Sequence, residues 1–286
     1  MKTIEYLYHF TKDLVSLKEI LRGSFKPSYA KEKIDTNDIL VPMVSFSNIL
    51  LRDTGTDEVI FYGNYAIGFH RNWGISKELN PVIYTYENGI LQNSLNAFFY
   101  NSIFLKELQE FKLHLEELSK YKITFSSKIW LSNTPKEVVD ILDYLSLNYS
   151  EELINILANQ AQSIYNSNLH ILQLTKPYKV YNGSGKEFIA YNDREWRKQY
   201  PDLGFIIDEF EYKTWESKAK PHFHEEKYLL KFDIQDVKVI LVDSDIEVLE
   251  ITQHLKNLYG NSVIENLIDN KSLFIGTRDT LIKQNF

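Results

Sequence analysis

The chain has 286 residues, enough to bury a substantial hydrophobic core as one domain or as a domain with a large insertion. Its composition, 44% hydrophobic and 25% charged, excludes wholesale disorder. A net charge of −7 argues against a surface built for nonspecific nucleic-acid binding, and the absence of cysteine excludes disulfides and thiolate chemistry. Because no signal-peptide core and no membrane-spanning apolar run are found, we expect a cytoplasmic protein with no membrane partner.

The first block of the chain alternates strand and helix signals. Residues 4–10 predict a strand, and residues 12–21 predict a short amphipathic helix that ends at Gly23. Residues 40–46 predict a second strand, near an edge or starting at Met43 because of Pro42. Residues 62–73 predict a turn at Gly63 followed by a strand or a helix, and residues 82–86 a further strand.

The middle of the chain is helical, and strand signals return after it. Apolar residues repeat at helical spacing from about residue 91 to residue 171, including one stripe between Phe104 and Leu118. Strands are predicted at 178–181, 187–191, 228–232, 237–242 and 273–275, with helices at 246–258 and 278–283. We therefore predict one α+β domain over residues 1–286, interrupted by a helical insertion at about 91–172.

His9 is the first candidate site residue. It stands in Tyr8-His9-Phe10-Thr11 at the end of an apolar strand, and Thr11 alternates onto the same strand face. The pair has the chemistry to hydrogen-bond a ribose or a phosphate. The alternative is a histidine that is simply satisfied in the core or at a strand end.

Glu195 and Arg197 are the second candidate pair. Strand alternation in Arg194-Glu195-Trp196-Arg197 puts these two side chains on one face. A carboxylate beside an arginine stays ionised, and near an anomeric carbon it would stabilise oxocarbenium-like charge during glycosyl transfer. The alternative is an exposed strand that carries surface ion pairs of little energetic value.

Two further motifs carry polar groups that a ligand could use. Ser45 and Ser47 place two hydroxyls on one strand face, where they could clamp a ribose or an amide. In Tyr62-Gly63-Asn64-Tyr65 the glycine would let backbone approach a ligand while a tyrosine ring stacks on it. Each motif is also compatible with ordinary packing.

A metal site is considered at His222-Phe223-His224-Glu225-Glu226, where two histidines share a strand face. The surrounding lysines and the lack of a second cluster of metal ligands favour a solvated charged loop, so we expect no metal.

As an ordered set, several motifs resemble the AbiGi family of bacterial abortive-infection proteins, which act in phage defence. The motifs are Tyr8-His9-Phe10-Thr11, Ile20-Leu21-Arg22-Gly23, Pro42-Met43-Val44-Ser45-Phe46, Tyr62-Gly63-Asn64-Tyr65, Asn80-Pro81-Val82-Ile83-Tyr84 and Arg194-Glu195-Trp196-Arg197. The resemblance covers roughly residues 6–86 and 176–242. It implies an antitoxin-like partner of a nucleotidyltransferase-type toxin.

The opening motif also resembles the start of ADP-ribosyltransferase folds. That resemblance implies a split sheet and NAD as co-substrate, with His9 and Thr11 as ribose contacts. It further implies a nicotinamide pocket lined by Ser45, Ser47 and Tyr62 or Tyr65, Glu195 as the catalytic carboxylate, and Arg197 or Arg194 as a phosphate contact. ADP-ribose would pass to a nucleic acid or to a host or phage protein.

Three hypotheses of function follow from these resemblances. The first is an ADP-ribosyltransferase of phage defence, which requires His9 and Glu195 to meet in one pocket. The second is a noncatalytic antitoxin that binds a cognate toxin, with Glu195 and Arg197 as a structural ion pair and the 104–118 helix as a partner surface. The third is processing of nucleic-acid ends or 2′-phosphates on the same scaffold.

Overall fold

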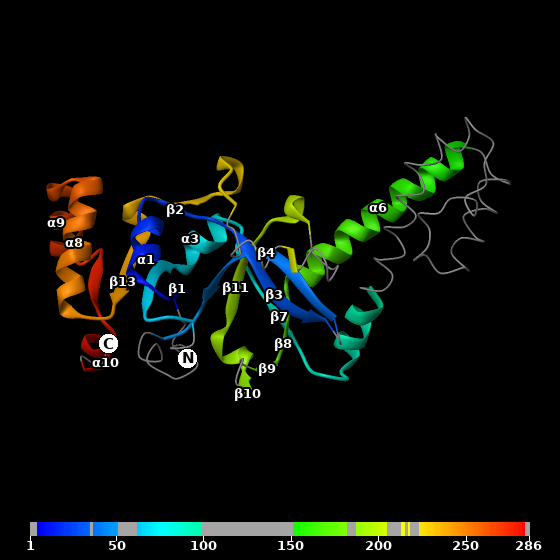
Figure 1. Ribbon diagram of the computed structural model, residues 1–286, viewed down its shortest axis with the longest axis horizontal. Helices are drawn as coiled ribbons and strands as arrows, with labels where there is room; N and C mark the ends of the chain where they lie inside the picture. Colours follow the sequence, from blue (N-terminus) through cyan, green and yellow to red (C-terminus); the bar gives the residue numbers. More distant parts are fainter. Residues whose placement is uncertain are drawn as a thin grey trace. The chain divides into compact units, whose positions relative to one another are not determined.

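A computed structural model describes residues 5–34, 37–50, 62–98, 151–181, 187–204, 213–214, 217 and 223–283. The chain divides into two compact units, one made of residues 1–87 and 174–286 and the other of residues 88–173. In the second unit, residues 90–98 are helical and α6 (Glu151–Gln173) is a long helix (Figure 1). All other labelled elements belong to the first unit.

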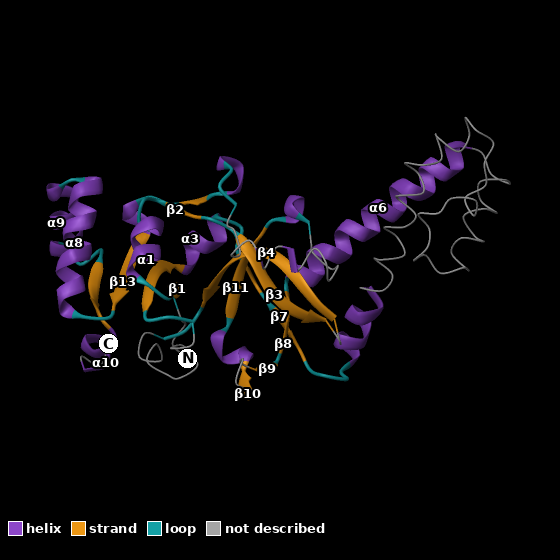
Figure 2. Cartoon of the chain, viewed as in Figure 1, coloured by secondary structure: helices purple, strands orange, loops and turns teal. Residues whose placement is uncertain are grey.

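The first unit is a mixed structure of strands and shorter helices (Figure 2). Its strands are β1 (Tyr6–Thr11), β2 (Ser24–Phe25), β3 (Ser28–Ile34), β4 (Asn37–Ser47), β5 (Tyr65–His70), β6 (Asn80–Pro81), β7 (Ile83–Thr85), β8 (Thr175–Pro177), β9 (Lys179–Tyr181), β10 (Glu187–Ile189), β11 (Glu195–Gln199), β12 (Leu230–Lys231), β13 (Val237–Val242) and β14 (Phe274–Thr277). Its helices are α1 (Leu14–Ile20), α3 (Arg71–Ser76), α8 (Asp245–Tyr259), α9 (Asn261–Asp269) and α10 (Arg278–Lys283).

One large sheet dominates the described part of this unit. Eight strands form it, in the order β14-β13-β5-β1-β4-β11-β6, with β3 paired to β4 outside this path. Its neighbours are antiparallel except β13 and β14, which are parallel and are joined through α8 and α9. The chain thus places its first strand beside strands from residues 37–47 and 65–70, in the middle of the sheet.

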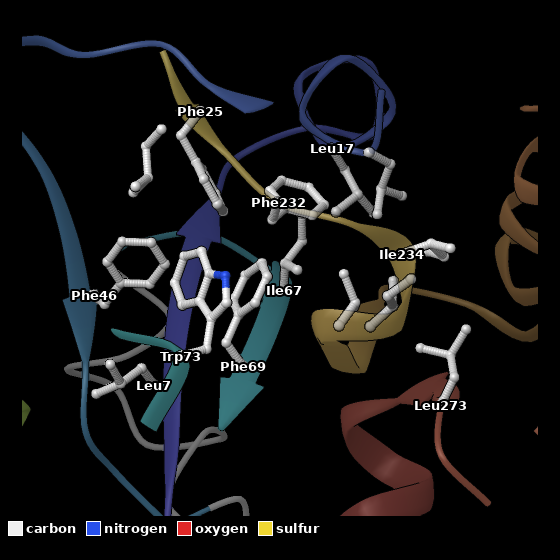
Figure 3. Packing of buried hydrophobic residues seen from close by; sticks show 14 of the residues in the cluster. Leu7, Leu17, Phe25, Phe46, Ile67, Phe69, Trp73, Phe232, Ile234 and Leu273 are labelled. Carbon is white, nitrogen blue, oxygen red and sulfur yellow. The ribbon is translucent and has the colours of Figure 1, made fainter. Parts of the chain in front are cut away.

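An aromatic core fills one face of the sheet, which we call the aromatic face (Figure 3). The rings of Phe69 and Trp73 are stacked with their centroids 3.9 Å apart, and the rings of Phe25, Phe46 and Phe232 meet Phe69 at steeper angles. Helices α1, α8 and α9 contribute leucines and isoleucines to the same core. Edge-to-face and offset contacts of this kind are the favoured aromatic geometries, so the core is both large and specifically packed.

The helix that follows β13 has strong local signals for its position. Ser244 and Glu247 form a capping box, each side chain accepting from the other residue's backbone N–H. Gly260 adopts a φ of 93° at the far end, a conformation that ends the helix before α9 begins. These signals explain why the helix expected at residues 246–258 is present with almost the same bounds.

Several expectations from the sequence are confirmed. The mixed α+β class is correct, and strands occur close to the expected positions at β1, β4, β7, β9, β10, β13 and β14. At residues 62–73 both alternatives are present in succession, since β5 is followed directly by α3. The ADP-ribosyltransferase-like form of the sheet stays a prediction.

Other expectations are wrong or fall elsewhere. A start of β4 at Met43 is wrong, because the unexpected strand β3 pairs along its first half and β4 begins at Asn37. The alternative of an edge position fits better, since Pro42 pairs with β3 while β11 and β1 pair only with residues from Met43 onwards. The stripe from Phe104 to Leu118 lies outside the described residues, as does His222 of the charged loop. No helix in the described ranges is both long and apolar enough to span a bilayer.

Candidate functional site

The candidate pair Glu195 and Arg197 lies on β11, between β4 and β6. In the register of the sheet Glu195 is opposite Ser47 and Arg197 is opposite Ser45. Trp196 packs with the aromatic core, so Glu195 and Arg197 project from the other face of the sheet, which we call the charged face. The expected alternation therefore holds, and all four polar side chains share one face.

Glu195 and Arg197 are buried and belong to a chain of four alternating charges, which we call the charge network. Arg197 Nε donates to Glu195 Oε1 at 2.6 Å, and Lys176 Nζ donates to Glu195 Oε2 at 2.6 Å. Arg197 Nη2 also donates to Glu32 at 2.5 Å, and Nη1 donates to the Thr175 carbonyl at 3.2 Å. Arg197 is 0% exposed and Glu195 is 7% exposed, so the alternative of an exposed strand with surface ion pairs is wrong.

The charge network holds Glu195 in its ionised form. Burial alone would raise the pKa of Glu195, but the positive charges of Arg197 and Lys176 lower it to about 2. Burial raises the pKa of Glu32, and the same two cations oppose that rise. Burial would lower the pKa of Lys176 and of Arg197, yet the adjacent carboxylates raise both. The two cations and two carboxylates balance in charge, so their mutual attraction offsets the free-energy cost of removing them from water.

Three neighbouring groups extend this polar region. The Tyr62 hydroxyl donates to Asp193 Oδ2 at 2.7 Å, and the Lys176 ammonium lies 6.0 Å from the centre of the Tyr62 ring. The Glu195 backbone N–H donates to the Tyr84 hydroxyl at 2.7 Å. Tyr62 therefore lies near the charge network, as a partner of a buried acid and not as an open stacking platform.

His9 lies on the aromatic face. Its Nδ1–H donates to the Ser45 carbonyl oxygen at 2.8 Å, since a carbonyl can only accept. Its ring lies 4.8 Å from the ring of Phe25 and 5.5 Å from that of Phe46, centre to centre. Both phenylalanines belong to the aromatic core, and Leu7 beside them on β1 does too. His9 is thus partly buried and packs against the aromatic core.

The strand register shows that His9 and Glu195 are on opposite faces. The single pair that joins β1 to β4 is Tyr8 with Ser47, and Ser47 pairs in turn with Glu195. Directly paired residues share a face, so Tyr8, Ser47 and Glu195 point one way and His9 points the other. The shared pocket expected for these two groups is not formed, because their strands present them to different sides of one sheet.

The other expected site residues divide in the same way. Thr11 lies two residues after His9 on β1 and therefore shares its face of the sheet. Tyr65 pairs with Thr11 and packs against the aromatic core. The Tyr65 hydroxyl donates to Glu247 of α8 at 2.9 Å. The structure therefore brings Ser45, Ser47, Tyr62, Glu195 and Arg197 together, and separately places His9, Thr11 and Tyr65 on the aromatic face. Their catalytic and NAD-binding roles stay predictions.

Two members of the charge network were not found from the sequence. Lys176 stands in a three-residue strand, and Glu32 stands in Lys31-Glu32-Lys33, which is typical of an exposed hairpin. Neither segment has a local signal of burial. Only the pairing of β3 with β4 and of β4 with β11 brings Glu32 to Arg197.

The depressed pKa of Glu195 predicts a loss of stability in acid. Its pKa falls from 4.5 to about 2 on folding, so its stabilisation is complete above pH 4.5 and disappears as pH falls towards 2. Glu32 acts with the opposite sign, because its raised pKa favours the folded state at low pH. We expect Glu195→Gln to flatten the pH dependence of the urea midpoint over that interval. An unchanged slope would contradict the pairing of Glu195 with two cations.

Comparison with known proteins gives an informative match to a protein family. A family model of abortive phage resistance matches the chain over residues 25–243. That model is described as "Putative abortive phage resistance protein AbiGi, antitoxin", and because it covers most of the chain, the protein belongs to the AbiGi family. No curated protein and no solved structure matches the chain. The match includes β3, β4, β8, β11 and β13, and therefore every member of the charge network.

Proposed function

We propose that this protein is a noncatalytic antitoxin of a phage-defence system, which acts by binding a cognate toxin. Membership of the AbiGi family supports the role in phage resistance, and the description of that family as an antitoxin supports the partner. The structural observation that supports a noncatalytic role is the pairing of the Glu195 carboxylate. Both of its carboxylate oxygens are engaged by buried cations.

A carboxylate that directs ribosyl transfer must touch the ribose or face the developing positive charge. Glu195 is buried, and its own partners already neutralise its charge. His9, the expected ribose contact, lies across the sheet from it. These features support a structural role for Glu195 and Arg197, as in the antitoxin hypothesis.

The proposal is tested by expressing the chain alone and together with the product of its neighbouring gene. An antitoxin is harmless alone, restores growth when the neighbouring gene product is toxic, and purifies with that product as a complex. Incubation of the purified chain with NAD should release no nicotinamide. Growth arrest by this chain alone, accompanied by nicotinamide release that Glu195→Gln abolishes, would instead establish the ADP-ribosyltransferase hypothesis.

A further inference from the structure

Three aliphatic side chains on neighbouring helices are left in solvent. Val15 of α1 is 71% exposed, and Ile246 and Leu249 of α8 are 77% and 73% exposed. We call these three residues the α1/α8 patch. Single exposed aliphatic residues are common, but a contiguous group of them marks a surface that a partner covers.

Contacts between the two helices place these residues near one another. Lys18 pairs with Glu250, and the Tyr259 hydroxyl donates to the Leu21 carbonyl at 2.6 Å, so α1 and α8 run side by side in the same direction. Val15 lies one turn before Lys18, and Ile246 lies one turn before Glu250. The exposed aliphatic residues of both helices therefore lie about one turn before this contact, towards the N-terminal ends of α1 and α8.

The patch is held on a rigid support. The opposite sides of the two helices bury Leu17, Ile251 and Leu255 in the aromatic core. The side chain of Asp13 caps α1 by accepting from the Ser16 N–H at 2.7 Å, and the Ser244 capping box fixes α8. A surface fixed in this way loses little conformational entropy when a partner binds.

Carboxylates surround the same helix ends. Asp245 and Glu247 lie in the first turn of α8, and Asp243 and Asp13 precede α8 and α1. Glu247 accepts from the Tyr65 hydroxyl at 2.9 Å, and Asp243 accepts from Asn64 Nδ2 at 3.2 Å. Burial and these carboxylates raise the pKa of Tyr65 to about 12. The cations close to these carboxylates are Lys12, Lys18 and Arg278. Lys18 is already paired with Glu250, and Arg278 donates to the Gly63 carbonyl. The rim of the patch is therefore negative.

We propose that the α1/α8 patch is the surface through which this protein binds its partner, and that the partner presents protruding apolar side chains within a basic surface. The proposal rests on the antitoxin function and adds the place and chemistry of the contact. Charge complementarity selects a basic partner over a second copy of the chain, since two copies joined here would oppose like charges.

The test compares Ile246→Ser/Leu249→Ser with Ile75→Ser, which removes an isoleucine that is 57% exposed on α3, outside the patch. Binding of each full-length chain to the purified product of the neighbouring gene is measured at two salt concentrations. We expect the double variant to bind at least about ten-fold more weakly, and Ile75→Ser to bind like the parent chain. Binding by the parent chain should weaken as salt rises. Hydrogen exchange should slow in α8 on complex formation.

Each result separates the two proposals. Tight binding by the double variant, with slowed exchange elsewhere, would overturn the patch and leave the antitoxin function intact. No binding by the parent chain would overturn both. A dimer of the free chain that the double variant dissociates would show that a second copy occupies the patch, and would equally overturn the proposal.

Discussion

Replacing Arg197 with methionine is expected to destabilise the protein by about 3–5 kcal/mol. The guanidinium is fully buried and contacts both Glu195 and Glu32, so its removal leaves two buried carboxylates with Lys176 as their remaining cation in the charge network. The cost arises mainly from these uncompensated charges and only partly from the lost hydrogen bonds. Urea unfolding at neutral pH measures the change.

Lys198→Met is the matched control for this experiment. Lys198 is the next residue on β11 and pairs with the exposed Glu78, so its removal should change the unfolding midpoint much less than that of Arg197. The double variant Glu195→Gln/Arg197→Met should recover part of the loss, because it removes one of the stranded carboxylates. Additive losses in the two single variants would show that Glu195 and Arg197 do not act as a pair.

Phe69→Ala is expected to cost about 3–5 kcal/mol, the range for truncating a buried phenylalanine. Phe69 is 0% exposed, and its ring contacts Phe25, Phe46 and Trp73 among others (Figure 3). The cavity would open where strands β1, β4 and β5 meet α3, so little of the surrounding structure can collapse into it. Thermal and urea unfolding both measure this change.

Ile75→Ala serves as its control, because Ile75 is more than half exposed on the helix that carries Trp73. A small effect at Ile75 and a large one at Phe69 would locate the stability in the aromatic core. Equal effects at the two positions would contradict that location.

Local patterns predicted most of the elements but not how their faces combine. Alternation correctly placed Glu195 and Arg197 on one face, because that relation lies within a single strand. The relation between His9 and Glu195 depends on one pair between β1 and β4 and on the pairing of β4 with β11. A shift of one residue in either register would reverse it, and no local motif encodes that register.

Strand β3 and the burial around it could not be predicted from the sequence for physical reasons. Strand β3 reads Ser-Tyr-Ala-Lys-Glu-Lys-Ile, a polar sequence with little strand signal, and its formation depends on its partner β4. Glu32 reaches Arg197 only through this long-range pairing, and Lys176 reaches Glu195 from β8, which pairs with β7. The resemblance to the AbiGi family was correct. The resemblance of the opening motif to ADP-ribosyltransferases required His9 and Glu195 to lie close together, and the strand register places them on opposite faces of the sheet.

The parallel pairing of β7 with β8 has a consequence for shortening this protein. The first unit is interrupted between these two strands, and Ile83 is opposite Thr175 while Thr85 is opposite Pro177. A segment that replaces residues 88–173 must therefore run from the end of β7 back to the start of β8. That start lies beside the beginning of β7, roughly 7–10 Å away along the strands at the usual rise per residue. A two-residue hairpin cannot do this, so a truncated form would require a crossover linker, and relatives that differ in the length of this interruption would keep such a return path.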